Sequence, residues 1–261
     1  EKVNHWVTFN EPKWFIASGY LIGNYPPCRQ DPQAMIHAAY HVMYASALGV
    51  RAFRQGKYPG TIGIVHSFTP VNGVDDTVNT RIAMRYADNY CNNWILDTAA
   101  KGEIPIDLLS ELSKSYDLSM IQPAQLQIIK ENTVDFLGLN YYSRTLVKPY
   151  TEGETTFIVN NSGKQGKVIV KGWFEQVMHD PASTYTEWDT EIYPKGLKDG
   201  LLEVKKKYNL PVYITENGIG MYEDVTVKQV EDDYRISFMK DHLQAMHEAM
   251  EAGVDVRGYF A

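Results

Sequence analysis

The sequence predicts an α/β fold in which a parallel sheet closes into a barrel. Short apolar runs alternate along the chain with helical patterns. These runs are almost continuously apolar, which is typical of strands covered on both faces. Polar or aromatic residues follow nearly every run, and a barrel collects such strand ends in one ring. They are Asn10 with Glu11, His66, Asn140 to Tyr142, and Glu216 with Asn217. A doubly wound sheet has the same local pattern and is the alternative.

The first half of the chain begins with an apolar run at 3–9, which is expected to be a buried strand. Pro12 ends this strand because proline has no N–H for a sheet ladder, so Glu11 lies where the strand passes into a loop. Aromatic residues and a double proline at 13–27 indicate a loop with a short helix. The other expected elements are helices at 32–56, 78–100, 105–115 and 123–131, a polar loop at 70–77, and strands at 61–66 and 134–140.

The second half contains a long insertion at 143–192, rich in Gly, Ser, Thr, Asn and aromatic residues. Alternation at Val168 and Val170 suggests a small antiparallel hairpin within it. Insertions of this length are usually functional, as a lid or as a wall of a site. The remaining expected elements are helices at 195–208 and 226–252 and strands at 210–215 and 254–260.

The ends and the charge of the chain suggest its extent and its compartment. The first residue is Glu1 rather than Met, and apolar runs lie at both ends, so residues 1–261 are expected to be a single, partial catalytic barrel domain from a longer chain. A net charge of −7 argues against nucleic-acid binding. Two cysteines, no leader and no apolar stretch of about 18 residues favour a cytoplasmic protein without a membrane partner. No metal or cofactor motif is present, so none is expected.

Glu11 and Glu216 are the candidate catalytic residues. Each follows an apolar strand and precedes a breaker, Pro12 or Asn217. Paired carboxylates can hydrolyse a glycosidic bond, because one donates a proton to the departing oxygen while the other attacks the sugar carbon. Either glutamate taken alone is more often a surface or capping residue, so the hypothesis depends on the pair.

Other polar and aromatic residues are candidates for binding a sugar. Asn10 carries an amide suited to a sugar hydroxyl, and Tyr142 can donate to an ionised carboxylate. Trp14 and Trp188 have flat apolar faces on which sugar rings stack. His66 also follows a strand, although a histidine in such a position is more often structural.

Several motifs, in order along the chain, resemble those of glycoside hydrolase family 1. They are Thr8-Phe9-Asn10-Glu11-Pro12, the stretch from Asp135 to Tyr142, the stretch from Glu191 to Leu197, Ile214-Thr215-Glu216-Asn217-Gly218, and Gly258-Tyr259-Phe260. The resemblance implies a (β/α)8 TIM barrel, of which this chain holds strands four to eight with the eighth truncated, and a retaining β-glycosidase. Glu11 matches the acid/base and Glu216 the nucleophile of the family. Asn10 matches the contact to the sugar 2-hydroxyl, Tyr142 the tyrosine bonded to the nucleophile, and Asn140 a residue of the same pocket.

Within that family, four stretches are most similar to bacterial 6-phospho-β-glucosidases, which act on phosphorylated disaccharides. They are Gly23 to Pro27, Gly63 to Ser67, Thr186 to Asp189, and Gly218 to Asp224. The family's phosphate-binding cluster would lie beyond Ala261, so an unphosphorylated β-glucosidase and a 6-phospho-β-galactosidase are alternatives. A relative that binds carbohydrate without catalysis is an alternative of another class. The fragment alone is expected to have little activity, because a half-barrel leaves strand edges unpaired. The oligomeric state stays open.

Overall fold

The computed structural model describes residues 3–158, 167–223, 226 and 231–261. It divides the chain into two compact units, each assembled from separate stretches of sequence. Unit 1 comprises Glu1–Phe68, Arg85–Asn140 and Leu210–Tyr213, and unit 2 comprises Thr69–Met84, Tyr141–Asn209 and Ile214–Ala261. The expectation of a single domain stays a prediction, and each unit is described by itself.

The strands expected in the main sheet are hydrogen-bonded in the order β1-β2-β4-β11-β12. Their bounds are His5–Asn10, Thr61–Phe68, Phe136–Tyr141, Val212–Glu216 and Val256–Tyr259. Strands β1 and β2 run parallel, with His5 opposite Thr61, which confirms the predicted parallel arrangement for this pair. The boundary between the units runs along β11, whose first residues belong to unit 1 and whose last belong to unit 2.

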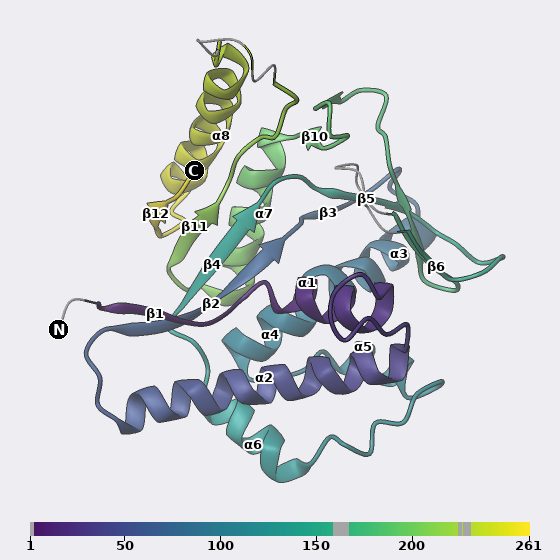
Figure 1. Cartoon of the computed structure of the whole chain (residues 1–261), viewed down its shortest axis with the longest axis vertical. Coiled ribbons are helices and arrows are strands. Elements are labelled where there is room, and N and C mark those ends of the chain that lie inside the picture. The colour runs from purple at the N-terminus through teal and green to yellow at the C-terminus, as the bar shows by residue number, and fades with distance from the viewer. Residues whose placement is uncertain (1–2, 159–166, 224–225, 227–230) are drawn as a thin grey trace. The chain divides into compact units, whose positions relative to one another are not determined.

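Unit 1 buries its strands under helices. All six residues of β4 are buried, and so are most residues of β2. The long helix α2 (Pro32–Gln55) packs against α4 (Trp94–Lys101) and α6 (Pro123–Glu131) (Figure 1). It starts at Asp31, whose side chain accepts a hydrogen bond from the Ala34 N–H at 3.0 Å, and this cap satisfies one of the free donors of the first turn. The shorter helices are α1 (Pro12–Ala17), the π-helix η1 (Ser18–Ile22) and α5 (Ile106–Leu112).

Strand β1 is more exposed than the sequence predicts. Its apolar run suggests a buried strand, yet Trp6 is 47% exposed and Val7 46% exposed. Its place in the sheet agrees with this exposure, because β1 stands at one end of the strand order and, among the described residues, is hydrogen-bonded to β2 alone.

The helix expected over 78–100 is divided into three segments. They are α3 (Val78–Asp88), the π-helix η2 (Asn89–Asn93) and α4. The Asn92 and Asn93 side chains donate to the two carboxylate oxygens of Asp88 at 2.8 and 2.9 Å. Side chains that bond locally in this way compete with regular helix geometry, and wider turns often lie near functional sites.

Unit 2 contains a second sheet of five strands in the order β3-β5-β8-β7-β6. The bounds are Val71–Gly73, Thr145–Lys148, Phe174–Val177, Lys167–Val170 and Thr156–Ile158. The pairs β5–β8, β8–β7 and β7–β6 are antiparallel, as predicted for the insertion. The sheet is larger than a hairpin, and it includes β3 from the stretch that the sequence predicts as a loop. The short strands β9 (Thr184–Tyr185) and β10 (Glu191–Ile192) form a separate antiparallel pair.

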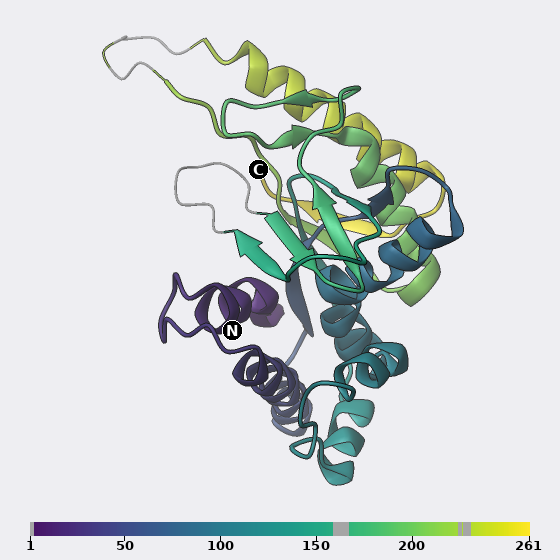
Figure 2. The same cartoon turned by 90° about the vertical axis from the view of Figure 1, so that its right-hand side faces the viewer.

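Two helices of unit 2 lie against each other in both views, α7 (Pro194–Tyr208) and α8 (Asp233–Glu251) (Figures 1 and 2). The Lys198 ammonium and the Glu248 carboxylate join them at 2.7 Å. Residues 227–230 of the predicted helix 226–252 lie outside the described residues. Among the described residues, no helix combines the length and apolar character needed to cross a membrane.

The turn before β2 needs a glycine. Gly60 has φ +98°, and a Cβ there would lie 1.9 Å from the Asn4 carbonyl oxygen. That oxygen accepts the Thr61 N–H at 2.8 Å, at the start of the β1–β2 pair. The backbone of Gly60 therefore approaches β1 more closely than any other residue type permits.

We expect Gly60→Ala to lower the free energy of unfolding of the full-length protein by more than about 2 kcal/mol. The added Cβ would displace the Asn4 backbone, and the alanine would have to adopt a positive φ. Gly172→Ala is the matched control, since Gly172 has φ +80° and no atom within 4 Å of the added Cβ. The control should cost only the conformational term of roughly 1–2 kcal/mol. Urea denaturation followed by circular dichroism measures both, and equal losses would contradict the close approach.

Candidate active site

Glu11 is positioned by an irregular end of β1. The strand pairs Val7 with Gly63 but Asn10 with Val65, so the register shifts just before Glu11. The Glu11 N–H still donates to the Val65 carbonyl at 2.9 Å. Its backbone then turns into the left-handed region, with φ 49° and ψ 55°, and α1 begins at the next residue, Pro12. This conformation costs a non-glycine residue roughly 1–2 kcal/mol, and such strain concentrates at functional sites.

Asn140 connects Asn10 and Glu11 within unit 1. Its side chain is on β4 and the residue is 1% exposed. The Nδ2 group donates to Asn10 Oδ1 at 3.1 Å and to Glu11 Oε1 at 2.9 Å. A primary amide has two hydrogens, so one group can serve both acceptors. The structure thus brings together three of the residues singled out in the sequence.

Tyr142 and Glu216 form a second pair, within unit 2. The Tyr142 hydroxyl donates to Glu216 Oε2 at 2.8 Å. Glu216 is the last residue of β11 and is half-buried, whereas Tyr142 is 42% exposed. The hydrogen bond orients the Glu216 carboxylate through its Oε2 atom.

Asn217 holds the chain directly after Glu216. It is 2% exposed, its Nδ2 donates to the Tyr141 carbonyl at 2.8 Å, and its Oδ1 accepts from the Tyr259 hydroxyl at 2.7 Å. Burial raises the pKa of Tyr259, which keeps that hydroxyl protonated as a donor. The sequence predicts only a turn here, because Asn-Gly is an ordinary turn dipeptide and nothing local reveals the two partners.

Comparison with known proteins gives a family. The model described as glycosyl hydrolase family 1 matches residues 1–261, the whole length of the chain. The chain belongs to this family.

Curated relatives of this family 1 chain include phosphoglycosidases. It is 35% identical over 272 residues to a 6-phospho-beta-galactosidase of Clostridium acetobutylicum, covering 100% of this chain and 57% of the relative. It is 30% identical to the aryl-phospho-beta-D-glucosidase BglC and 31% identical to the 6-phospho-beta-glucosidase GmuD, both of Bacillus subtilis, covering 99% of this chain and 55% of each relative. The chain therefore spans little more than half the length of these relatives.

Solved structures of similar fold include β-glucosidases. A beta-glucosidase from Exiguobacterium marinum matches with a TM-score of 0.83 and 29% identity, over 98% of this chain and 55% of that one. The family 1 β-glucosidase from Thermotoga maritima matches with a TM-score of 0.84 and 27% identity, over 99% and 54% of the two chains. The family 1 chain thus has the fold of part of these glucosidases, in agreement with the α/β prediction.

His66 is placed differently from the other candidates. The residue is fully buried, with 0% exposure, and its Nε2 bonds to the Cys91 carbonyl of η2 at 2.9 Å. Because a carbonyl only accepts, Nε2 carries the hydrogen. Burial, together with the nearby Lys13 charge, lowers the pKa of His66 to about 3. An imidazole without exposed surface cannot reach a ligand, so the structural alternative holds for His66 and it is left out of the proposed site.

The two candidate tryptophans are exposed, but they differ in their surroundings. Trp14 on α1 is 46% exposed, and its indole N–H points at the Tyr25 hydroxyl at 3.5 Å. Trp188 is 41% exposed, with its ring 6.0 Å from that of Tyr222. Both side chains are therefore partly accessible to solvent, and their role as stacking surfaces stays a prediction.

No group of three or more His, Cys, Asp or Glu side chains suited to a metal ion occurs within residues 3–158, 167–223, 226 and 231–261.

The burial of His66 predicts a pH dependence of stability. Below its ordinary pKa of 6.5, His66 is protonated in the unfolded chain, whereas in the folded protein it stays neutral down to about pH 3. The contribution of neutral His66 to the free energy of unfolding is therefore complete above pH 6.5. It falls as the pH drops, by up to about 1.4 kcal/mol per pH unit for this one proton. We expect His66→Gln, which can still donate to Cys91, to flatten the decline in unfolding free energy between pH 6.5 and 4.5.

His247→Gln is the control for this measurement. His247 lies on α8 with 62% of its side chain exposed, so its replacement should leave the slope unchanged. Denaturant titrations across the pH range measure both variants, and an unaltered slope in His66→Gln would contradict the assignment.

Proposed function

We propose that the full-length protein is a retaining β-glycosidase of 6-phospho-β-glycosides, with 6-phospho-β-glucosides as the leading substrates. Glu216 is the nucleophile and Glu11 is the acid/base. The observation that carries the proposal is that each carboxylate accepts a hydrogen bond from a different neutral donor, the Tyr142 hydroxyl or the Asn140 amide. The family membership of the whole chain supports the same chemistry.

In the first step, Glu216 attacks the anomeric carbon while Glu11 protonates the departing glycosidic oxygen. The bond from carbon to that oxygen breaks as the bond from carbon to the Glu216 carboxylate forms. The Tyr142 hydroxyl holds Oε2, so Oε1 is the oxygen proposed to attack. The same hydrogen bond fixes the orientation of the carboxylate toward the anomeric carbon in the proposed mechanism.

In the second step, Glu11 removes a proton from water, and that water displaces Glu216 from the anomeric carbon with overall retention. Asn10 is proposed to bind the sugar 2-hydroxyl. Its Oδ1 accepts from Asn140, which orients the amide so that its own Nδ2 is available to donate. Trp14 and Trp188 are proposed as stacking surfaces.

The substrate class is inferred from the relatives and from the sequence stretches shared with 6-phospho-β-glucosidases. The names of the curated relatives include both 6-phospho-galactosidase and 6-phospho-glucosidase activities. A β-glucosidase acting on plain sugars is the second candidate, favoured by the similarity to solved β-glucosidase structures.

We propose further that β1, β2, β4, β11 and β12 correspond to strands four to eight of a (β/α)8 barrel.

Substrate comparison with the full-length protein tests the substrate class. We expect turnover of nitrophenyl β-glucoside 6-phosphate to exceed that of the unphosphorylated glucoside by at least about a hundredfold in kcat/KM, the effect of about two charge-assisted contacts to phosphate. The galactoside 6-phosphate is measured in parallel. Faster hydrolysis of the plain glucoside would make the protein a β-glucosidase.

Substitution of the carboxylates tests the roles. Glu216→Gln should lower kcat by at least about 10,000-fold, because an amide cannot form the glycosyl intermediate. Glu11→Gln should spare substrates whose leaving group needs no proton, such as dinitrophenolate, and should slow alkyl glycosides severely. Asp76→Asn, on the exposed loop after β3, is the matched control and should be unaffected. An unchanged rate in Glu216→Gln would refute the assignment of Glu216 as the nucleophile.

A further inference from the structure

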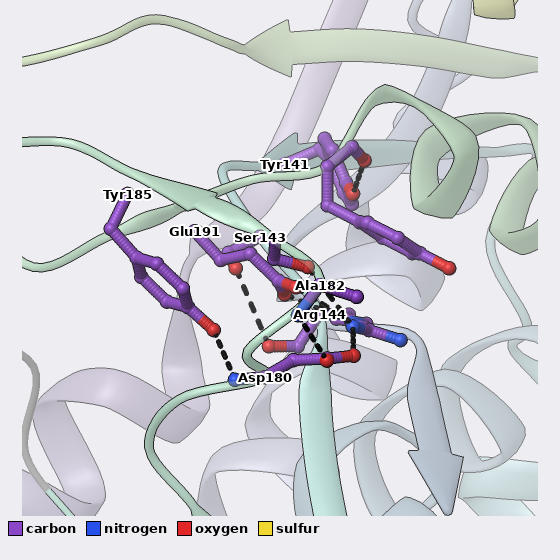
Figure 3. Close-up of polar contacts among 9 residues, drawn as sticks. Tyr141, Ser143, Arg144, Asp180, Ala182, Tyr185 and Glu191 are labelled. Atoms are coloured by element: carbon purple, nitrogen blue, oxygen red, sulfur yellow. Dashed lines mark hydrogen bonds and ion pairs between the residues drawn. The ribbon is translucent and has the colours of Figure 1, made fainter.

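A buried ion pair lies two residues after Tyr142 in unit 2. Arg144 Nε and Nη2 donate to the two carboxylate oxygens of Glu191 at 2.9 and 2.8 Å (Figure 3). The Arg144 side chain is 8% exposed and that of Glu191 is 7% exposed. Nη2 also donates to Asp180 Oδ2 at 2.7 Å. Burial alone would lower the pKa of Arg144, but the hydrogen bonds to Glu191 and Asp180 outweigh it and raise this pKa, so the cation is permanent.

Stability alone is a weak explanation for such a pair. Moving two charges out of water costs several kcal/mol per ion, and apolar residues of similar volume often stabilise a protein as well or better. A bidentate arginine fixes orientation, because its planar guanidinium binds a carboxylate in one geometry. The residues around Arg144 therefore show which part of the chain the ion pair orients.

Arg144 and Tyr141 both contact Tyr193. The Arg144 guanidinium lies over the Tyr193 ring at 3.9 Å, and the Tyr141 hydroxyl donates to the Tyr193 carbonyl at 2.6 Å. Tyr141 is fully buried, and burial, reinforced by the nearby Glu191 charge, raises the pKa of its hydroxyl, which stays a donor. Tyr142 thus lies between two residues that are both anchored to the segment Glu191 to Tyr193.

We propose that the Arg144–Glu191 ion pair is a positioning device that holds the Tyr142 hydroxyl on Glu216. This inference rests on the proposed function of Glu216. Tyr142 is 42% exposed, so the chain on either side contributes to the placement of its ring. A displacement of about 1 Å would break the 2.8 Å hydrogen bond and leave the nucleophile without its donor.

Two variants of the full-length protein test the device. Arg144→Lys keeps the charge but loses the fork and the stacking. The double variant Arg144→Met/Glu191→Leu removes both buried charges of the pair. Asp180 loses its bond to Arg144, but its side chain is 28% exposed and still accepts from the Ala182 N–H, so the double variant is expected to fold. In each variant we expect kcat on the best substrate to fall roughly 10- to 100-fold, the loss of one charge-assisted hydrogen bond, with KM changed less than about twofold.

A double-mutant cycle with Tyr142→Phe separates positioning from a general loss of structure. If Arg144 acts through the hydroxyl, then adding Arg144→Lys to Tyr142→Phe should change kcat by less than about twofold. Crystal structures of the variants should show the distance from the Tyr142 hydroxyl to Glu216 Oε2 lengthened beyond hydrogen-bond range. Lys198→Met, which removes the ion pair between α7 and α8 in the same unit, is the control and should retain parental kcat.

Parental kcat in Arg144→Lys and in the double variant Arg144→Met/Glu191→Leu would overturn the inference. So would a kcat for Arg144→Lys/Tyr142→Phe that is lowered by the product of the two single losses. Glu216→Gln in the same assay tests the proposed function separately. An inactive Glu216→Gln beside fully active Arg144 variants would reject the positioning device alone. A fully active Glu216→Gln would reject the proposed function and the inference with it.

Discussion

The hydrogen bond from the Tyr142 hydroxyl to Glu216 is the contact that the surrounding hydrogen bonds of unit 2 hold in place. It joins the end of β4 to the end of β11, and its surroundings keep both ends in place. Asn217 fixes the chain beyond Glu216 by bonding to Tyr141 and Tyr259. Tyr141 and Arg144 fix the chain on either side of Tyr142. An exposed tyrosine can therefore hold one orientation because its neighbours are buried and bonded.

Unit 1 positions its carboxylate by other means. A register shift in β1 and a left-handed backbone direct Glu11, and a buried amide, Asn140, holds both Glu11 and Asn10. The Asn140 amide donates to Glu11, and the Tyr142 hydroxyl donates to Glu216. In the proposed mechanism the two glutamates have different roles, and different local environments are how a protein separates such roles.

Family membership and substrate preference stand on different grounds in this protein. The whole chain matches glycosyl hydrolase family 1, while its relatives at 30–35% identity carry the names of both phosphoglucosidases and phosphogalactosidases. A hydroxyl of inverted configuration is distinguished by a few polar contacts, and few contacts have little weight in overall identity. The proposed mechanism is common to both sugars, because its two carboxylates act on the anomeric carbon.

Local patterns were sufficient to predict the alternation of strands and helices, the breaks at Pro12 and Asn217, and the two glutamates at strand ends, because apolar periodicity and proline geometry are local properties. Motifs also indicated Asn10, Asn140 and Tyr142. The burial of His66, the exposure of β1 and the pairing of Arg144 with Glu191 became visible in the folded structure. Burial and pairing depend on residues distant in sequence, so no local pattern carries them.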